Sequence, residues 1–75
     1  MKTNNNVANY IATTGVTKHM ERSAAIKVWN DLKQDGWRAE GFTMVKVSET
    51  TECHFAFERY GSKVKVSYRA MEVAS

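Results

Sequence analysis

In the C-terminal third of the chain, apolar and polar residues alternate almost without a break on both sides of the pair Gly61-Ser62. Such alternation is typical of strands with one buried face, and it predicts strands at about 53–60 and 63–71. A Gly-Ser pair between two alternating runs favours a two-residue type II′ turn, with glycine at the first central position. The turn fixes the facing pairs of the hairpin, among them Phe55 with Tyr68 on the inner face and His54 with Arg69 on the outer face.

A third strand is predicted at about 42–48, before the polar stretch SETTE. We expect a three-residue loop at 49–51, which places Val45 opposite Phe55 and therefore on the inner face. The positions between the inward-facing ones then belong to the outer face: Phe42, Met44 and Lys46.

One long helix is predicted at about 18–35. Thr17 is a suitable N-cap, Gly36 suits the left-handed residue that ends many helices, and Trp37 lies where an apolar residue packs back on the last turn. Apolar residues recur along this segment at steps of three or four, as in an amphipathic helix: Met20, Ala24, Ala25, Val28, Trp29 and Leu32.

The N-terminal segment 7–16 permits two interpretations. Tyr10 and Ile11 have helical spacing with Val7, and Gly15 is a stop, but the same residues also fit an edge strand. Either element could fold over the outer face of the sheet and fill it. We expect the polar residues 1–6 to fray.

Together these patterns predict a single α+β domain over residues 1–75. One long helix (about 18–35), with or without a short helix before it, packs on a three-stranded antiparallel meander. The expected strands are about 42–48, 53–60 and 63–71. Because the apolar stripe of the helix covers the inner face of this sheet, function is expected on the outer face.

The outer face predicted in this way mixes apolar, aromatic and basic side chains. Apolar and aromatic groups beside small residues such as Ala56 and Ser67 are what a docking surface offers to a protein partner. We therefore expect partner contacts from eight residues of this face: Phe42, Met44, Lys46, His54, Tyr60, Lys63, Lys65 and Arg69.

Within that set, Lys46, His54 and Arg69 are expected in one row across the three strands. A phosphate could bridge such a row while Tyr60 or Phe42 stacks on a base, as in sheet-based RNA-binding domains. Nucleic-acid binding, with RNA as the preferred ligand, is therefore the alternative function. The formal net charge of +3 and the pI of about 9.2 permit this function without requiring it.

Catalytic chemistry is not expected. Cys53 and His54 are neighbours along a strand, so one faces inward and the other outward, and they cannot act as nucleophile and base. His19 is expected at the start of the helix. The two histidines and one cysteine are divided among the start of the helix and the two faces of a strand, so we expect no catalytic residue, no metal site and no cofactor.

The order of a helix, the motif DGW at 35–37 and three strands resembles the element order of HicA-type RNA-cleaving toxins and of the double-stranded-RNA-binding domain. Membership of the toxin family would give His54 a catalytic role. The chain departs from both patterns, because ECH at 52–54 replaces the Gly-Ser-His stretch of the toxins and only EVAS remains where a helix would follow the last strand. No family is therefore assigned from the sequence.

Composition places the chain among ordinary soluble domains, with 43% hydrophobic and 25% charged residues. A single cysteine, Cys53, excludes an internal disulfide and fits a reducing compartment. The start, MKTNNN, lacks the apolar run of a secretory signal, and no stretch has the length of a membrane span. We expect a cytoplasmic protein without a membrane partner.

The leading hypothesis is a small non-enzymatic protein-binding module that acts as a regulator, inhibitor or accessory protein through the outer face of its sheet. Stand-alone domains of this size are common among phage and mobile-element proteins that block a host machine. Homodimerisation through an exposed edge strand, at 42–48 or 63–71, is a third hypothesis.

Overall fold

The computed structural model of the chain describes residues 6–73. The described part has two helices and five strands: α1 (Asn6–Thr14), β1 (Lys18–Glu21), α2 (Arg22–Gln34), β2 (Arg38–Glu40), β3 (Thr43–Val47), β4 (Thr51–Tyr60) and β5 (Lys63–Glu72). All strand pairs are antiparallel, and the order across the sheet is β1-β5-β4-β3-β2. The predicted α+β class with an antiparallel sheet is confirmed, although the sheet has more strands than the three expected.

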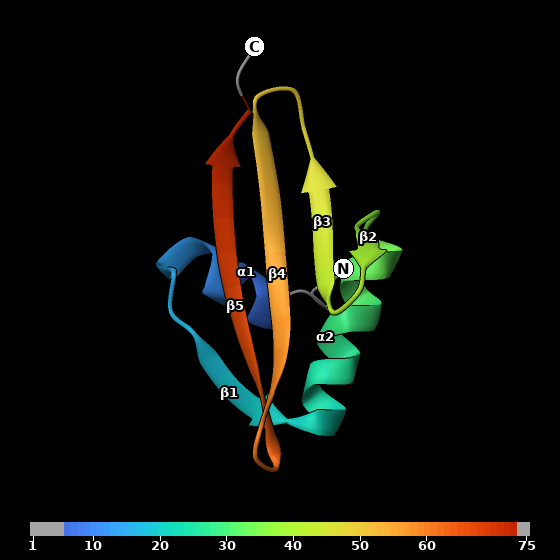
Figure 1. Ribbon diagram of the computed structural model, residues 1–75, viewed down its shortest axis with the longest axis vertical. Coiled ribbons are helices and arrows are strands. Elements are labelled where there is room, and N and C mark those ends of the chain that lie inside the picture. Colours follow the sequence, from blue (N-terminus) through green and yellow to red (C-terminus); the bar gives the residue numbers. More distant parts are fainter. Residues whose placement is uncertain (1–5, 74–75) are drawn as a thin grey trace.

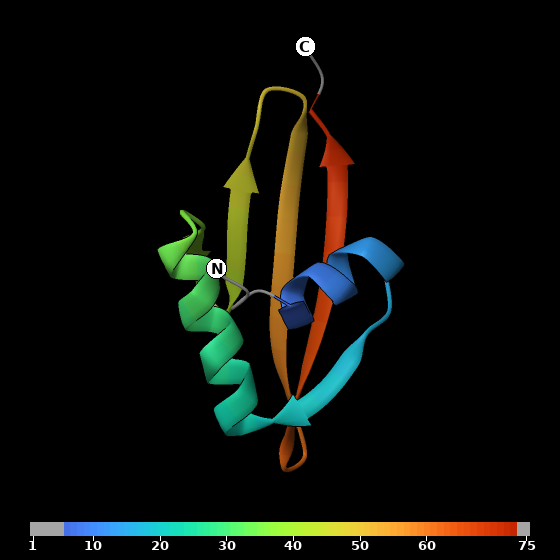
Figure 2. The same cartoon turned by 180° about the vertical axis from the view of Figure 1, so that it is seen from behind.

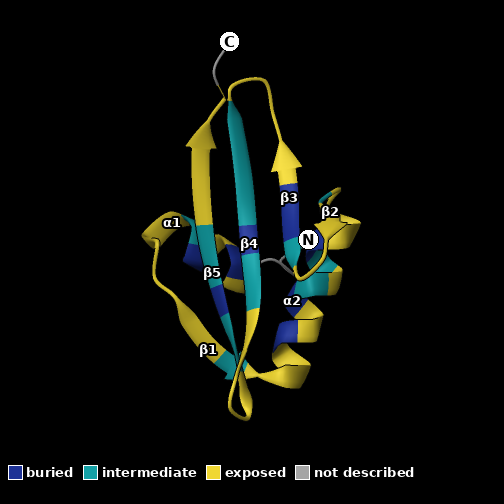
Figure 3. Cartoon of the chain, viewed as in Figure 1, coloured by how far each residue is buried: buried dark blue, intermediate teal, exposed yellow. Residues whose placement is uncertain are grey.

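Both helices lie on one face of the sheet, which we call the covered face; the other is the open face (Figures 1 and 2). The buried positions lie in the middle of β3, β4 and β5 and on the sides of the helices turned toward them (Figure 3). The core consists of eight side chains, with Phe55 and Met44 at its centre: Ala8, Ile11, Ala25, Val28, Leu32, Met44, Phe55 and Val66.

Helix α1 confirms the helical interpretation of the N-terminal segment. Ile11 is fully buried against the sheet, and the Thr14 hydroxyl donates a hydrogen bond to the Tyr10 carbonyl at 2.7 Å. The sequence left open whether this segment covers the outer face, and α1 packs on the covered face instead. The prediction of fraying falls on residues 1–5, which lie outside the described residues, and on Asn6, which begins α1.

Helix α2 begins at Arg22, not near residue 18 as predicted, because residues 18–21 form β1. In β1, Lys18 pairs with Val66 and Met20 pairs with Val64, so this short strand extends the sheet beyond β5. Met20 still packs against the core, but from a strand. Met20 has helical spacing with the apolar residues of α2, and for this reason the sequence assigned it to the helix, although it is an inward-facing residue of β1.

The C-terminus of α2 follows the prediction. Ala25, Val28 and Leu32 are buried. The Gly36 N–H donates to the Lys33 carbonyl at 3.1 Å, and the Trp37 N–H donates to the Leu32 carbonyl at 3.0 Å. These two bonds form a Schellman motif, which satisfies carbonyls that the end of a helix leaves free.

The β4–β5 hairpin has the predicted register. His54 pairs with Arg69 and Phe55 with Tyr68. Gly61 has a φ of +65°, whereas Ser62 is not among the residues of positive φ. A positive φ at the first central residue alone defines the type II′ turn.

The register predicted for the first hairpin is wrong by one residue. Met44, not Val45, lies opposite Phe55, and Val45 lies opposite His54. A shift of one residue moves every side chain of a strand to the other face. Met44 is consequently on the covered face at 0% exposure, while Val45 is on the open face, buried among its neighbours at 3%.

The position of Lys46 explains why this register is tolerated. Lys46 now lies on the covered face, beyond the last turn of α2, and its ammonium donates to the Asp35 carbonyl at 3.1 Å. The same nitrogen lies 3.9 Å from the Asp35 carboxylate and 5.9 Å from the centre of the Trp37 ring. A cation at the C-terminus of a helix is favoured by the helix dipole, so the inward-facing lysine is partnered.

Strand β2 was not predicted. Glu40 pairs with Thr43 across the two-residue turn Gly41-Phe42, and Gly41 has a φ of +63°. This turn has the same form as Gly61-Ser62. It places the Phe42 side chain outside the sheet, where 81% of the residue is exposed.

Candidate docking groove

The structure divides the eight predicted contact residues among three places. Five of them share the open face, as their strand pairings require: His54, Tyr60, Lys63, Lys65 and Arg69. Met44 and Lys46 are on the covered face, so the predicted row of Lys46 with His54 and Arg69 does not form. Phe42 lies in the β2–β3 turn. Because Met44 is fully buried, it cannot contact a partner while the fold is intact.

The cations of the open face are largely paired with carboxylates of the same face. The Lys63 ammonium lies 3.4 Å from the Glu21 carboxylate, and the Lys65 ammonium lies 3.5 Å from the Glu58 carboxylate. Arg38 and Glu40 form a third pair. This face therefore carries little positive potential of its own for a phosphate backbone.

His54 is half-buried on the open face between Val45 and Arg69. Its Nε2 lies 3.4 Å from the Glu52 carboxylate without meeting hydrogen-bond geometry to any described residue. Glu52 and Arg69 are the charged neighbours of His54 on this face.

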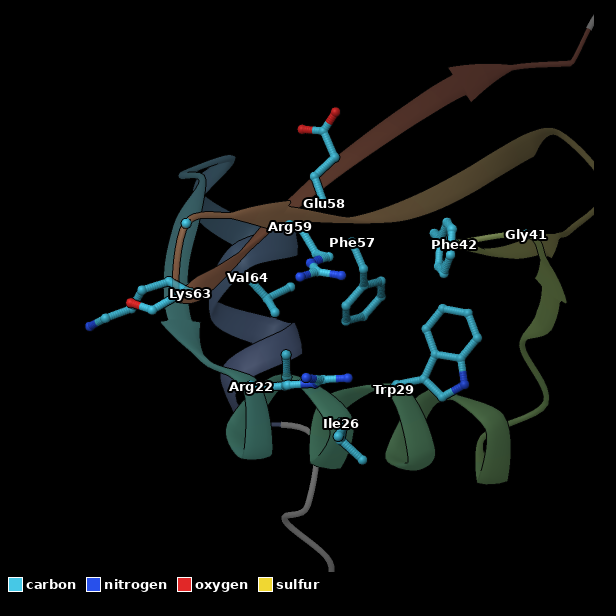
Figure 4. A pocket seen from close by; sticks show the side chains of 13 residues that line it. Arg22, Ile26, Trp29, Gly41, Phe42, Phe57, Glu58, Arg59, Lys63 and Val64 are labelled. Carbon is cyan, nitrogen blue, oxygen red and sulfur yellow. The ribbon is translucent and has the colours of Figure 1, made fainter.

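A groove of about 610 Å³ opens between α2 and the tip of the β4–β5 hairpin, and the Gly41-Phe42 turn closes one end (Figure 4). Its volume lies within the range of ligand and peptide pockets. One wall is the N-terminal half of α2, and the other wall is the covered face of β4 and β5. Thirteen residues line it: Arg22, Ala25, Ile26, Trp29, Gly41, Phe42, Phe57, Glu58, Arg59, Gly61, Ser62, Lys63 and Val64.

Large apolar side chains form the floor and rim of the groove. Trp29 and Phe57 meet edge to face, with ring centres 5.1 Å apart, at the boundary with the core. Phe42 and Ile26 lie at the rim and are 81% and 52% exposed. Single exposed apolar residues are ordinary, but a contiguous set around a concavity is typical of a binding site.

The charged side chains of the groove are mostly positive. Arg22 comes from α2 and Arg59 from β4, and both project into the space between the two walls (Figure 4). Neither arginine has an ion pair with a carboxylate of the described residues. Glu58 is the single acidic residue of the lining, and its carboxylate turns away from the groove toward Lys65.

Cys53 and Tyr68 lie together on the covered face of β4 and β5. The Tyr68 hydroxyl donates to Cys53 Sγ at 3.2 Å. This hydrogen bond, with smaller contributions from burial and from the charge of the Cys53 thiolate, raises the pKa of Tyr68 to about 12. As the sequence predicts, Cys53 and His54 are on opposite faces. Within residues 6–73, no three His, Cys, Asp or Glu side chains come together as a metal site requires.

Sequence reasoning missed most of the groove, although the chain contains signals for it. Arg22, Ile26 and Trp29 are spaced i, i+4 and i+7, which defines a second stripe beside the core stripe of α2. Arg59 shares the parity of Phe57, so alternation alone places it on the covered face. The turn at Gly41 has the same Gly-X pattern as the turn that was recognised at Gly61.

No protein-family model, no curated protein and no solved structure matches this chain. Neither α1 nor α2, the helices of residues 6–73, has the length and apolar character needed to cross a membrane. Any functional assignment therefore depends on the surfaces of the molecule.

Proposed function

We propose that this chain is a small non-enzymatic protein-binding module, of the regulator, inhibitor or accessory kind, and that its partner docks in the groove between α2 and the β4–β5 hairpin. The observation that carries the proposal is Phe42, an aromatic residue 81% exposed at the edge of an apolar concavity. Aromatic side chains that fill a partner's pocket are the usual centres of binding energy in interfaces.

The groove supports docking better than the open face does. Two of the predicted contact residues, Met44 and Lys46, are not on the open face, and the cations Lys63 and Lys65 of that face already have acidic neighbours. The groove combines exposed apolar area with a concave shape, and the centre of an interface needs both. We therefore place the docking surface in the groove, and not on the outer face that the sequence predicted.

The two other hypotheses receive less support. Nucleic-acid binding was argued from Lys46, His54 and Arg69 in one row, and the register of β3 separates Lys46 from the other two. Homodimerisation was argued from edge strands at 42–48 and 63–71. Strand β2 pairs with residues 43–45 and β1 with residues 63–66, so these parts of the predicted edges are occupied, and short strands form the edges of the sheet there.

The test compares matched exposed residues of the groove and the open face. Phe42→Ala and Ile26→Ser alter the groove, while Tyr60→Ala and Val47→Ser are controls of similar exposure on the open face. We expect each groove variant to weaken partner binding about tenfold or more, because truncation of a central anchor typically costs roughly 1–2 kcal/mol or more.

The measurement is affinity capture from lysate with each variant as bait, followed by quantitative mass spectrometry and a binding constant for the captured partner. A partner retained by wild type and by both controls but lost with both groove variants supports the proposal. A partner lost with Tyr60→Ala and retained by the groove variants would assign docking to the open face. Circular dichroism confirms that every bait is folded.

A further inference from the structure

The groove carries two arginines that have no ion pair with a carboxylate of the described residues. Arg22 and Arg59 come from opposite walls and project into the same space (Figure 4). Among the other described cations, Arg38, Lys46, Lys63 and Lys65 each have a carboxylate within 4 Å, whereas Lys18, Lys27, Lys33 and Arg69 have none and lie outside this groove. Two guanidinium groups that share a concavity repel one another, and an anion between them removes that repulsion.

From the placement of two unpaired arginines in one apolar groove we propose that the groove binds an acidic amphipathic peptide segment, in which a bulky apolar side chain is followed closely by a carboxylate. The inference depends on the protein-binding function proposed above and specifies the chemistry of the partner. The apolar side chain packs against Trp29 and Phe57, under the rim formed by Phe42. The carboxylate binds to Arg22 and Arg59, whose planar guanidinium groups match carboxylate geometry.

The charge of the lining supports an acidic ligand over a basic one. Glu58 is turned to Lys65 on the open face, with 3.5 Å between the charged atoms, so no carboxylate of the lining faces the interior of the groove. A basic segment would place its charges against Arg22 and Arg59 and would find no carboxylate inside. Juxtaposed like charges cost free energy and exclude wrong partners.

The shape of the site favours a peptide over a nucleic acid. Non-specific binding of a nucleic-acid backbone uses a stripe of cations along several phosphates. Here two unpaired arginines occupy one part of a groove whose remaining floor is aromatic and aliphatic. An amphipathic segment binds by placing its apolar face in a hydrophobic groove, and this groove offers apolar side chains beside a local positive charge.

The test uses two blocked ten-residue peptides that carry the same leucine and tryptophan residues. One peptide has glutamates at every polar position and the other has lysines. Fluorescence anisotropy of the labelled peptides gives the dissociation constants for the full-length protein. We expect the acidic peptide to bind at least tenfold more tightly, and we expect its binding to weaken as the salt concentration rises, because the arginines are exposed to solvent.

Charge reversal in the groove then tests the residues. Arg22→Glu with Arg59→Glu should reverse the preference of the protein between the two peptides, with a loss of about tenfold in acidic-peptide affinity for each arginine. The matched control is Arg69→Glu with Lys27→Glu, which changes the net charge equally at exposed sites outside the groove. This control should preserve the preference.

Three outcomes would overturn the inference. The first is equal affinity of the wild-type protein for the two peptides, or no binding of either. The second is concentration-dependent self-association that the groove variants abolish, which would make a second copy of the chain the occupant. The third is binding of single-stranded RNA in competition with the acidic peptide. If Phe42→Ala loses the captured partner in any of these cases, the proposal of a protein-binding groove still stands. If Phe42→Ala still captures the partner, both the protein-binding groove and the acidic ligand are ruled out.

Discussion

On the open face of the sheet, Lys63 and Lys65 each have a glutamate within 3.5 Å, while in the groove neither Arg22 nor Arg59 has a carboxylate partner among the described residues. The apolar groups differ in their arrangement. Tyr60 and Val47 are exposed near opposite ends of the open face, whereas Phe42 and Ile26 are exposed around one concavity. The charges of the open face are largely paired within the chain, and the two arginines of the groove are not.

This difference shows that composition alone is a poor guide to a docking surface. Both regions contain aromatic, apolar and basic residues, and the sequence favoured the open face because the apolar stripe of the long helix was expected to cover the inner one. The energetic criterion is whether those groups already have partners within the chain. A surface charge that is already paired within the chain gains little from a new partner. An unpaired cation beside an exposed aromatic side chain can still form an ion pair with a ligand that also packs on the aromatic ring.

The largest expected effect tests which residues of β3 belong to the core. Met44→Asp places a carboxylate at a fully buried position beside Phe55 and should destabilise the fold by more than about 3 kcal/mol. The control is Val47→Asp, at a position on the open face that is 55% exposed, where a change within about 0.5 kcal/mol is expected. Urea unfolding followed by circular dichroism measures both. Equal stability of the two variants would contradict the register of β3.

A smaller effect concerns the covered face at high pH. The hydrogen bond to Cys53 raises the pKa of Tyr68 from the ordinary 10 to about 12. Below pH 10 the phenol is neutral in the folded and the unfolded chain. Between about pH 10 and 12 the unfolded chain loses the proton while the folded chain retains it, so the free energy of unfolding falls as the pH rises.

Tyr68→Phe should remove this contribution and leave a flatter loss of stability across that pH range. The direct measurement is the tyrosinate absorbance of wild type minus that of Tyr68→Phe as a function of pH. We expect the difference curve to have its midpoint near pH 12. A midpoint near 10 would mean that the hydrogen bond between Tyr68 and Cys53 does not persist in solution. Cys53→Ala should lower the midpoint by removing the acceptor.

The smallest expected effect lies on the open face itself. A double-mutant cycle with Glu58→Gln and Lys65→Gln should give a coupling free energy of about 0.2–0.5 kcal/mol, because the pair is exposed to solvent and directly cross-strand. Thermal or urea unfolding of the four proteins measures it. A coupling above about 1 kcal/mol would indicate that this face is organised for more than solubility.

The sequence predicted those parts of the fold that a local signal determines. Gly61-Ser62 fixed one hairpin, and Gly36 with Trp37 fixed the end of α2. The first hairpin was misplaced because SETTE has no glycine to define its turn, and both registers bury plausible apolar residues. Only the tertiary contacts of Lys46 with the end of α2 show why Met44, and not Val45, faces the core.

The groove was harder to predict because it depends on three elements that are distant along the chain. Ile26 on α2, Phe42 in the β2–β3 turn and Arg59 on β4 come together only when the sheet and helix are assembled. Strand β1 added to the difficulty, because its four residues continue the helical pattern of α2. What alternation did give correctly is the placement of Cys53 and His54 on opposite faces.

The most direct test of the account is to map where a ligand binds on the folded protein. The measurement is an amide-resolved NMR titration of the labelled protein with the acidic amphipathic peptide, at low and at physiological salt. The account predicts shifts confined to the groove, in residues 22–29, 41–42, 57–59 and 61–64, with His54, Ser67 and Arg69 on the open face unchanged. Shifts centred on the open face, with residues 22–29 unchanged, would contradict it.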